Sequence, residues 1–522
     1  MMQYIQGNNR DQICLFPQSL DQIVDADNEV RVIDLFVETI RLSDYAFVMK
    51  TSVEGRPAYH PKDLLKLFIY GYLNHIRSSR QLERECTRNV ELMWLLKGLV
   101  PDHNTIANFR RDNDKAIRKV FRHTVSIARM FDLIGGKLLA GDSTKLRAQN
   151  SRKNNFNEKK IAYHLQYIES RLDEYTKALE TADDENKKVL EQKIETQHER
   201  KQEYEALQQS LEESEESQIS TSDPDSRKLM IRNNICEVAY SVQTVVDEKH
   251  NLPIDFKVTN ETDANAMSGM LRRAKTIVGH SSFTALYDKG YHTGSEIKKA
   301  VEMGVEIMVA VPGPGAFAPD ENYNADKFLY NETTDTYTCP QQQILSTNNR
   351  TYTKNTTQNS YQTKKYSSPY CKNCPARALC TRSERGRVLE RTEYQSFIEI
   401  NKQNIAKNPA LYKKRQSIVE HPYGTIKRQW GYDHVMTKTG MKRASADIGM
   451  IFIAYNLRRL INIIGKIELM SYLKRLASLI LSFLILLHFR KRGAGYNFVN
   501  DQFLFSVIPA RIGAEKIDFY RN

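Results

Sequence analysis

The sequence predicts an α/β protein whose strand-bearing core follows an all-helical segment and is interrupted by two insertions. Three observations support this prediction. Residues 30–131 repeat apolar side chains at intervals of three and four, strand-like segments begin at residue 137 and return beyond Pro224, and residues 158–216 carry a helical seam. A chain of 522 residues with 40% hydrophobic content corresponds to about three domains of ordinary size.

The first 134 residues are expected to form a helical domain with a role in DNA binding. Apolar residues such as Leu64, Leu65 and Phe68 recur at helical spacing, and turn residues are sparse. The basic residues here, Arg77 and Arg110 among them, leave two interpretations open, a solvated helix face or a contact with DNA.

The core begins at residues 135–157, where the pattern of the sequence changes. Residues 137–147 read as a short strand that carries Asp142. Residues 158–220 then form an inserted helical hairpin, because apolar side chains alternate by four and three on both sides of a break at residues 181–187.

Strand signals return in residues 221–315, which continue the core. Residues 238–246 alternate in side-chain character, and a turn at 248–251 leads to a partner strand at 252–258. We then expect a helix at about 264–274, a strand at 283–287 ending at Asp288, a helix at 294–303, a strand at 306–311 and a Pro- and Gly-rich break at 312–315.

Residues 316–405 are expected to be an irregular, cysteine-bearing insertion, because they are rich in Asn, Gln, Thr and Tyr and show little periodicity. Helical spacing resumes near residue 410 and marks the end of the core, residues 406–489. The most apolar stretch, 476–489, is shorter than the about 18 to 20 residues of a bilayer span, so we expect a buried helix without membrane contact. We assign no role to the tail, residues 490–522.

The balance of charge indicates the class of partner. Lys and Arg number 76 against 63 Asp and Glu, and the net charge of +13 favours a polyanion, nucleic acid first. Residues 1–16 lack the pattern of a secretory signal, so we expect a cytoplasmic protein.

Three acidic residues are candidates for a metal-dependent site. Asp142 and Asp288 lie on or at the end of predicted strands, where side chains of neighbouring strands can converge, and Glu420 lies on a helix that could cover that edge. Hard cations such as Mg²⁺ bind carboxylate oxygens, and two ions about 4 Å apart can serve both oxygens of a phosphoryl transfer. Because the chain has 63 acidic residues, the sequence around each candidate must decide between function and chance.

The sequences around these three acids resemble those of a known family. They read Gly141-Asp142-Ser143-Thr144-Lys145, Asp288-Lys289-Gly290-Tyr291 and Val419-Glu420-His421-Pro422-Tyr423-Gly424. These motifs resemble those of the DDE transposases of bacterial insertion sequences, in particular the group numbered eleven eighty-two. That group is related to the insertion-sequence four and five transposases. A related signature is matched by the spacing of Lys427, whereas Arg415 stands five residues before Glu420 instead of four and Tyr412 is displaced with it.

The resemblance extends from about residue 30 to about residue 465 and implies an RNase H-like catalytic core. In such a core Asp142, Asp288 and Glu420 bind two Mg²⁺ ions, with Mn²⁺ as a substitute, and activate water and then a DNA 3′-hydroxyl for in-line attack. The implied function is cleavage at the ends of an insertion sequence and their joining to target DNA. The implied partners are double-stranded DNA and at least a second copy of the chain, and the implied location is the bacterial nucleoid.

Two alternatives come from other classes of protein. A non-catalytic DNA-binding protein derived from a transposase would be favoured by the loss of one acid, and none of the three is missing. A structural coiled-coil protein would explain residues 158–216 alone.

Four cysteines form a second candidate site. Cys371 and Cys374 make a C-x-x-C knuckle, Cys380 follows closely and Cys339 lies upstream, so four thiolates are available for tetrahedral zinc. We favour structural Zn²⁺ over free thiols, because the polar stretch 340–370 could not order itself by apolar burial, and over a redox pair, because no thioredoxin-like pattern surrounds the knuckle. The other cysteines, expected to be ordinary buried or free residues, are Cys14, Cys86 and Cys236.

Basic residues lie close to both candidate sites, with phosphate contact as the expected role and a solvated charged face as the alternative. Those flanking Glu420 are Lys413, Lys414, Arg415, Lys427 and Arg428, and those following the knuckle are Arg377, Arg382, Arg385, Arg387 and Arg391. Trp430 could stack on a base or pack against its helix, and His421, beside Pro422, could approach the metals or have a local structural role.

Overall fold

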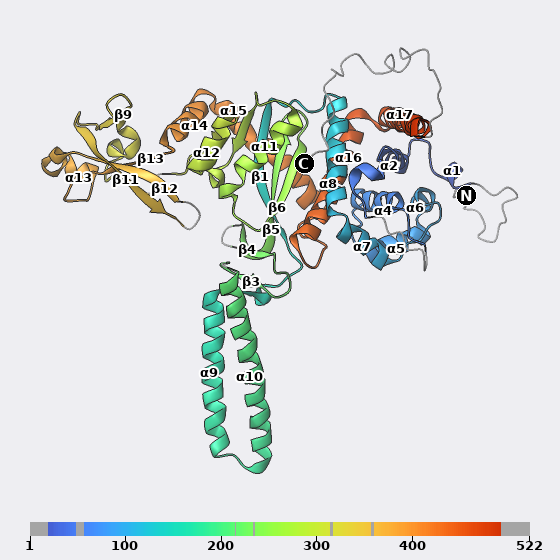
Figure 1. Cartoon of the computed structure of the whole chain (residues 1–522), viewed down its shortest axis with the longest axis horizontal. Helices are drawn as coiled ribbons and strands as arrows, with labels where there is room; N and C mark the ends of the chain where they lie inside the picture. Colours follow the sequence, from blue (N-terminus) through green and yellow to red (C-terminus); the bar gives the residue numbers. More distant parts are fainter. Residues whose placement is uncertain are drawn as a thin grey trace, which may run out of the picture.

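The computed structural model describes residues 19–48, 57–214, 216–232, 235–313, 317–356 and 360–491. The expectations for residues 1–16, for Cys14 and for the tail from residue 492 lie outside these ranges. Figure 1 shows a central sheet between the N-terminal helices on one side and a smaller sheet on the other, with a long helical hairpin projecting from the centre. The predicted α/β class is confirmed.

The predicted helical character of the N-terminal segment is confirmed. Its helices are α1 (Leu20–Ile23), α2 (Glu29–Glu38), α3 (Leu42–Tyr45), α4 (Pro61–Leu73), α5 (Ser79–Arg88), α6 (Val90–Leu95), α7 (His103–Asp112) and α8 (Asp114–Met130). Helix α4 begins with Pro61 at its first turn, behind a His60 side chain that accepts the Lys62 amide, and most of its residues are buried. Tertiary packing in the centre of the domain therefore stabilises this helix.

Two arginines of this segment, Arg77 and Arg110, lie neither on a solvated face nor at a DNA-binding surface. Both are buried against the fully buried carboxylate of Asp447, with N–O distances of 2.7 Å and 3.3 Å. Burial alone would raise the pKa of Asp447, but the two guanidinium groups outweigh this effect and hold it below the ordinary value. These ion pairs connect the N-terminal helices to a helix more than 300 residues later.

The central sheet contains the five predicted strands and one further strand, β4, that was not predicted. They are β1 (Leu138–Arg147), β4 (Arg227–Arg232), β5 (Ile235–Asp247), β6 (Leu252–Thr259), β7 (Thr284–Tyr287) and β8 (Glu306–Val309). Their order is β4-β5-β1-β7-β8, with β6 also paired to β5. Strand β1 runs antiparallel to β5 and parallel to β7, and β7 runs parallel to β8.

Helices cover both faces of this sheet (Figure 1). One face packs on α8, α11 (Met267–Val278), α12 (Gly294–Glu302) and α16 (Met441–Ile464) in the main hydrophobic core. The other face, with Leu138 and Ala140 of β1 and Leu286 of β7, packs on Ile418 and Val419. These two residues belong to α15 (Pro409–Tyr423), which follows α14 (Gln395–Lys407) and continues into a π-helical turn, Gly424–Gln429.

The inserted hairpin is formed by α9 (Glu158–Glu180) and α10 (Asp184–Glu213), as predicted. At its base, Ile161 of α9 and Leu211 of α10 form a small buried core with Phe156, which precedes α9, and with neighbouring side chains such as Tyr204. The two-stranded sheet of β2 (Asn155–Phe156) and β3 (Ile219–Ser220) connects this hairpin to the central part of the molecule.

The expectation of an irregular insertion after residue 316 is wrong. This segment contains an antiparallel sheet of order β13-β12-β11-β10-β9. Its strands are β9 (Leu329–Asn331), β10 (Thr336–Thr338), β11 (Ile344–Asn355), β12 (Ser360–Ser367) and β13 (Leu389–Thr392). Thr and Tyr supply strand propensity, but most positions of β11 are exposed or half-buried, so apolar alternation is absent.

The expectation of a buried helix at residues 476–489 is wrong for the side chains that the structure describes. These residues belong to α17 (Lys466–Lys491), where Leu479 and Leu481 are 44% and 61% exposed. No single described helix is long and apolar enough to cross a membrane, and one pair, α16 with residues 466–482, passes that test only across a bend of 113°.

Candidate active site

Asp142 lies within β1, and Asp288 directly follows β7, the neighbouring strand that runs parallel to β1. The register pairs Leu138 with Thr284 and Ala140 with Leu286, and two further residues along each strand lead to the two aspartates. Since side chains alternate between the faces of a strand, both carboxylates share the face of Ala140 and Leu286, beneath α15. The charge of Asp288 contributes to the raised pKa of Asp142, as expected for close carboxylates.

The Asp142 carboxylate lies in a half-buried, partly compensated environment. Its Oδ2 accepts a hydrogen bond from Arg415 Nη1 at 3.0 Å, and its Oδ1 accepts the Ser143 amide at 2.7 Å. The side chain of Asp142 is 23% exposed and that of Arg415 is 19% exposed. Burial raises the pKa of Asp142 to about 6, although the neighbouring Arg415 opposes this shift.

Asp288 begins a short 3₁₀ turn, Lys289–Tyr291, directly after β7. Its Oδ1 accepts the Gly290 amide at 2.9 Å, so the carboxylate is oriented by its own turn. The preceding residue, Tyr287, is buried beside Gly141 of β1, where an added Cβ would lie 2.0 Å from the tyrosine ring. Gly141 therefore allows Tyr287 to lie beside β1, next to both aspartates.

Glu420 lies on the same helix as Arg415 but presents an exposed side chain. Its Oε1 accepts a hydrogen bond from Gln416 Nε2 at 2.7 Å. Tyr412 and Arg415 point from α15 to the sheet, where Tyr412 donates to the Tyr287 carbonyl at 3.0 Å, whereas Glu420 lies on the flank of the helix. The structure thus brings Asp142 and Asp288 together and leaves Glu420 at the surface.

The carboxylates fit a hard cation in part. Asp142 and Asp288 offer carboxylate oxygens just beyond the point where the pairing of β1 with β7 ends, which is the ligand chemistry of Mg²⁺. Within the ranges that the structure describes, however, no three Asp, Glu, His or Cys side chains are already arranged to hold a metal ion.

Tyr423 and Lys427, which follow Glu420 in the sequence, fix α15 and its π-helical turn over β1. The Tyr423 hydroxyl donates to the Asp142 carbonyl at 3.1 Å and lies 2.5 Å from the Thr244 hydroxyl. Lys427 Nζ donates to Thr144 Oγ1 at 3.2 Å and to the Lys145 carbonyl at 3.1 Å, and its burial lowers the pKa of this ammonium. Pro422 lies inside α15 just before the turn and lacks an amide hydrogen, consistent with the change from α- to π-helical bonding.

A further acidic residue, Asp263, lies near Asp288 and was not expected from the sequence. Its carboxylate accepts Lys145 Nζ at 3.1 Å and Gln243 Nε2 at 2.7 Å. A Cβ added at Gly290 would lie 3.7 Å from Asp263 Oδ2 and 3.1 Å from Asp288 Oδ1. Asp263 belongs to a short 3₁₀ turn after β6, and the only sequence signal was its place just beyond a predicted strand.

The other residues considered from the sequence have identifiable surroundings. Lys414 pairs with Glu248 at 2.9 Å, whereas Lys413 and Arg428 are exposed. His421 lies 2.7 Å from the Tyr455 hydroxyl, and Trp430 packs with aromatic rings that include Tyr455, so the structural alternative holds for both.

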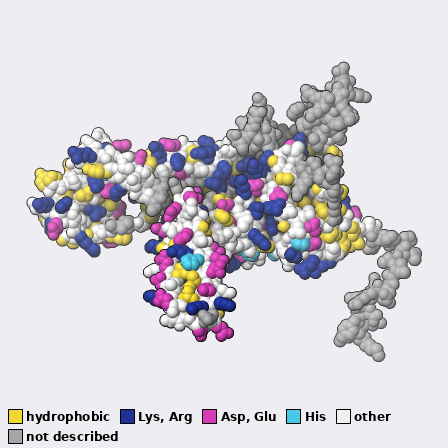
Figure 2. Space-filling model, turned by 60° about the horizontal axis from the view of Figure 1, so that its bottom comes forward, with side chains coloured by type: hydrophobic (Ala, Val, Ile, Leu, Met, Phe, Trp, Pro, Cys, Tyr) yellow, Lys and Arg dark blue, Asp and Glu magenta, His cyan; other side chains and the backbone are white. Residues whose placement is uncertain are grey.

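Charge is unevenly distributed over the surface. Figure 2 shows Asp and Glu along the projecting hairpin and Lys and Arg gathered on the adjoining body of the molecule. Among the arginines after the knuckle, Arg391 pairs with Glu399 at 2.6 Å and Arg377 donates to two backbone carbonyls, whereas Arg382 and Arg385 are exposed.

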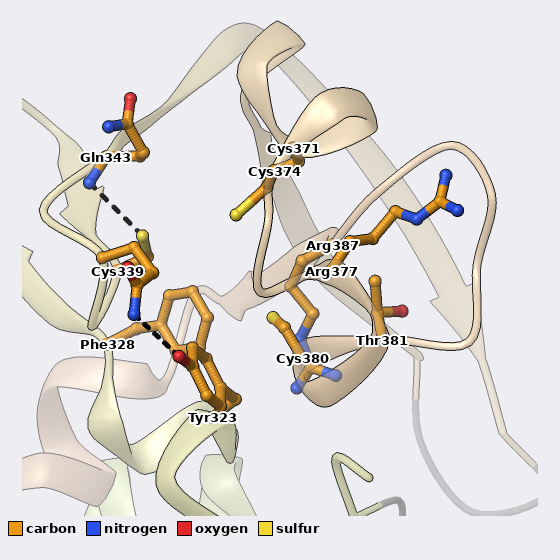
Figure 3. A pocket seen from close by; sticks show the side chains of 11 residues that line it. Tyr323, Phe328, Cys339, Gln343, Cys371, Cys374, Arg377, Cys380, Thr381 and Arg387 are labelled. Carbon is orange, nitrogen blue, oxygen red and sulfur yellow. Dashed lines mark hydrogen bonds between the residues drawn. The ribbon is translucent and has the colours of Figure 1, made fainter. Parts of the chain in front are cut away.

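The four cysteines of the insertion lie around one small cavity (Figure 3). Cys339, Cys371, Cys374 and Cys380 all line it, together with Arg377 and Arg387. Cys86 is buried and Cys236 is half-buried, both as free thiols, in agreement with the expectation of ordinary residues.

Comparison with known proteins gives two family matches. Residues 18–112 match a family described as a transposase domain, DUF772, and residues 338–461 match a transposase DDE domain. The second match includes Glu420 and the four cysteines, whereas Asp142 and Asp288 lie between the two matched regions. Among curated proteins, none matches.

A solved transposase structure matches over most of the length of both chains. It is a cryo-EM structure of a piggyBac transposase synaptic complex with hairpin DNA, with 10% sequence identity over 95% of this chain and 88% of that chain. Its TM-score is 0.31, so the similarity carries no argument about fold or function.

Proposed function

The chain belongs to the DDE transposases of insertion-sequence type, and from this premise we propose that it cleaves DNA at the ends of its insertion sequence and joins them to target DNA. The observation that carries the proposal is the placement of Asp142 and Asp288, each two residues beyond the last paired residues of the neighbouring parallel strands β1 and β7. The mixed sheet, with β1 and β7 parallel and α15 above them, supports an RNase H-like arrangement of the core.

We propose that Asp142 and Asp288 hold divalent cations, with Glu420 as the third ligand. Mg²⁺, or Mn²⁺ in its place, would supply activation of the attacking oxygen and neutralisation of charge on the phosphate, with two ions in the complete site. The exposed carboxylate of Glu420 accepts a hydrogen bond from the neighbouring Gln416, and among the described residues no buried partner opposes its recruitment to the site.

Arg415 and neighbouring basic residues place positive charge beside the proposed metal site. The planar guanidinium of Arg415 is bonded to Asp142 of β1, a position from which it could contact a phosphate. Tyr423 and Lys427 hold α15 on β1 through backbone acceptors, which fixes the position of Arg415 relative to Asp142. Lys413, Lys414 and Arg428 are the proposed phosphate contacts on the exposed flank.

The charge of the hairpin favours a protein partner there. Residues 158–216 contain 17 acidic and 9 basic residues, although the whole chain has a net charge of +13. Such a surface repels DNA, so we propose that DNA binds the basic body and that the hairpin contacts a second copy of the chain. A homodimer would provide two active sites for two DNA ends.

The remaining assignments follow from the same proposal. Residues 1–134 would contribute to DNA binding, residues 135–157, 221–315 and 406–489 would form the catalytic core, and the segments 158–220 and 316–405 would be insertions into it. The enzyme would act in the cytoplasm, at the nucleoid, where its DNA substrate lies.

The direct test is metal-dependent nicking and strand transfer on labelled DNA that carries the ends of the element. With Mg²⁺, the wild type should nick and join, and Asp288→Asn should lose both activities but retain DNA binding in a gel-shift assay. Asp326→Asn, an exposed position of the insertion, is the matched control and should behave as wild type. Binding without cleavage by the wild type, with Mg²⁺ and Mn²⁺ alike, would instead support a non-catalytic DNA-binding protein derived from a transposase.

A further inference from the structure

Four cysteines from separate parts of the insertion surround a common cavity. Cys339 follows β10, Cys371 lies in the 3₁₀ helix Pro369–Asn373 with Cys374 directly after it, and Cys380 ends the short helix α13 (Arg377–Cys380). The cavity has a volume of about 20 Å³, enough for one small occupant. In Figure 3 Cys339 lies on one side of it, Cys371 and Cys374 lie above, and Cys380 lies below.

We propose that this cavity binds one structural Zn²⁺ ion through Cys339, Cys371, Cys374 and Cys380. Four thiolates are a complete tetrahedral set for zinc and leave no position open for a reacting group, as in structural rather than catalytic zinc sites. All four are free cysteines in the structure. This site is independent of the carboxylates at the central sheet and of the proposed transposition chemistry.

The surroundings of the thiols suit negatively charged sulfur. The backbone amide of Gln343 donates a hydrogen bond to Cys339 Sγ at 3.3 Å, in the manner that stabilises a metal-bound thiolate. Arg377 and Arg387 also line the cavity. Four thiolates and one Zn²⁺ carry a net charge of −2, and two guanidinium groups offset that charge.

The backbone around the knuckle is folded in a way that only glycine permits. Gly386 has φ +91°, and a Cβ added there would lie 2.5 Å from Cys371 Cβ. The loop between α13 and β13 therefore lies directly on the knuckle and carries Arg387 to the cavity. The Cys374 carbonyl accepts the Arg377 amide at 3.0 Å, which connects the knuckle to α13.

The insertion has a small hydrophobic core for its size, so a metal ion has a structural task there. The buried residues of this core are Phe328, Tyr337, Leu345, Tyr366 and Leu389. Cys339 and Cys380 pack against the same core, so an ion held by them would extend it. Small units with few buried apolar side chains commonly gain their stability from a metal or from disulfides.

Metal binding requires the four side chains to turn further into the cavity that they line. Within the described ranges no three thiol, imidazole or carboxylate groups already stand in ligand positions. The cysteines are half-buried, and their backbones already surround the cavity, so rotation about the Cα–Cβ bonds is the movement required.

The test measures metal and thiols in the full chain, purified without a metal-affinity step. Elemental analysis should find about one zinc per chain. Cys374→Ser and Cys380→Ser should each lose the zinc, whereas the matched controls Cys86→Ser and Cys236→Ser should retain it. Under native conditions four thiols should react slowly with a thiol reagent until a zinc-selective chelator is added.

Limited proteolysis guards against variants that fail to fold. In the wild type, removal of zinc should expose the insertion to cleavage, and added Zn²⁺, but not Mg²⁺, should restore protection. The proposal is overturned if the folded wild type contains no zinc, or if the denatured protein has only three of its seven thiols free because the other four form disulfides.

Discussion

Asp142 illustrates how one residue depends on its surroundings. The sequence placed this aspartate on a strand next to a serine, but it did not place Arg415 on the carboxylate or bury the pair under α15. Burial and the neighbouring Asp288 raise its pKa and Arg415 lowers it, so the resulting value of about 6 depends on all three elements.

The raised pKa of Asp142 predicts a pH dependence. Because the folded-state pKa lies above the ordinary value, protonation favours the folded form, and this contribution to stability is present below about pH 4 and lost as pH rises through about 6. Cations bind the ionised form, so metal-dependent cleavage should fall as pH drops through about 6.

Arg415→Gln should move the midpoint of that pH profile upward, because the guanidinium lowers the pKa of Asp142. Lys413→Gln, which removes an exposed charge from the same helix, is the control and should leave the midpoint in place. The pH profile of cleavage should be measured at constant ionic strength. An unchanged midpoint for Arg415→Gln would contradict this account of the site.

Gly141 provides a test of packing at the same position. Gly141→Ala would place a methyl group within 2.0 Å of the buried Tyr287 ring, and overpacking of this kind costs about 1–3 kcal/mol. Gly269→Ala, in helix α11 with open space around it, is the control and should keep or increase stability. Urea unfolding of the two variants should separate them, and equal stabilities would exclude the close approach of Tyr287 to β1.

At the scale of elements, prediction succeeded where burial produces a regular pattern. Strand β5 follows a visible alternation of side chains, the hairpin helices α9 and α10 follow helical spacing, and the structure contains them. The sheet of the insertion was missed because its strands expose most of their side chains. The charged positions Arg77 and Arg110 were misinterpreted because a buried ion pair with a residue more than 300 positions away leaves no local signal.

The candidate site was predicted in the same uneven way. Short sequence motifs pointed to Asp142, Asp288 and Glu420. They could not show that Asp142 and Asp288 follow matching positions of two parallel strands, or that Glu420 lies on an exposed flank of its helix. No sequence motif marks Asp263, because its proximity to Asp288 arises from two separate turns of the chain.

The buried cluster at Asp447 predicts a large stability effect at the junction of α4, α7 and α16. Asp447→Ala would leave the guanidinium groups of Arg77 and Arg110 without their buried partner, and such a loss costs about 3–5 kcal/mol. Asp27→Ala, which removes an exposed partner of Lys466, should cost far less. Denaturant unfolding tests this difference, and similar losses for the two variants would contradict a stabilising role for the cluster.

At the scale of the whole molecule, charge separates two surfaces. The hairpin is acidic and projects from a basic body, so repulsion from DNA and attraction to another basic surface act in the same direction (Figure 2). Its two helices expose Tyr163, Tyr167 and Val189, which adds apolar area for a protein contact.

Replacement of α9 and α10 by a short turn should therefore reduce self-association and leave binding of a single DNA end intact. Analytical ultracentrifugation with and without DNA would measure the first effect, and a gel-shift assay would measure the second. A matched control replaces exposed Lys187 and Lys188 with Gln near the tip of the hairpin and should preserve assembly. Loss of DNA binding together with the hairpin would place the DNA on this surface and overturn the assignment.

The central claim is that the carboxylates of Asp142 and Asp288 hold the catalytic cation. The measurement that tests it most directly is metal rescue of strand transfer by Asp142→Cys and Asp288→Cys. Thiolates bind Mg²⁺ poorly and softer divalent ions better, so both variants should be inactive with Mg²⁺ and regain activity with Mn²⁺. Full activity of either variant with Mg²⁺, or no rescue of a variant that still binds DNA, would contradict direct metal contact by these residues.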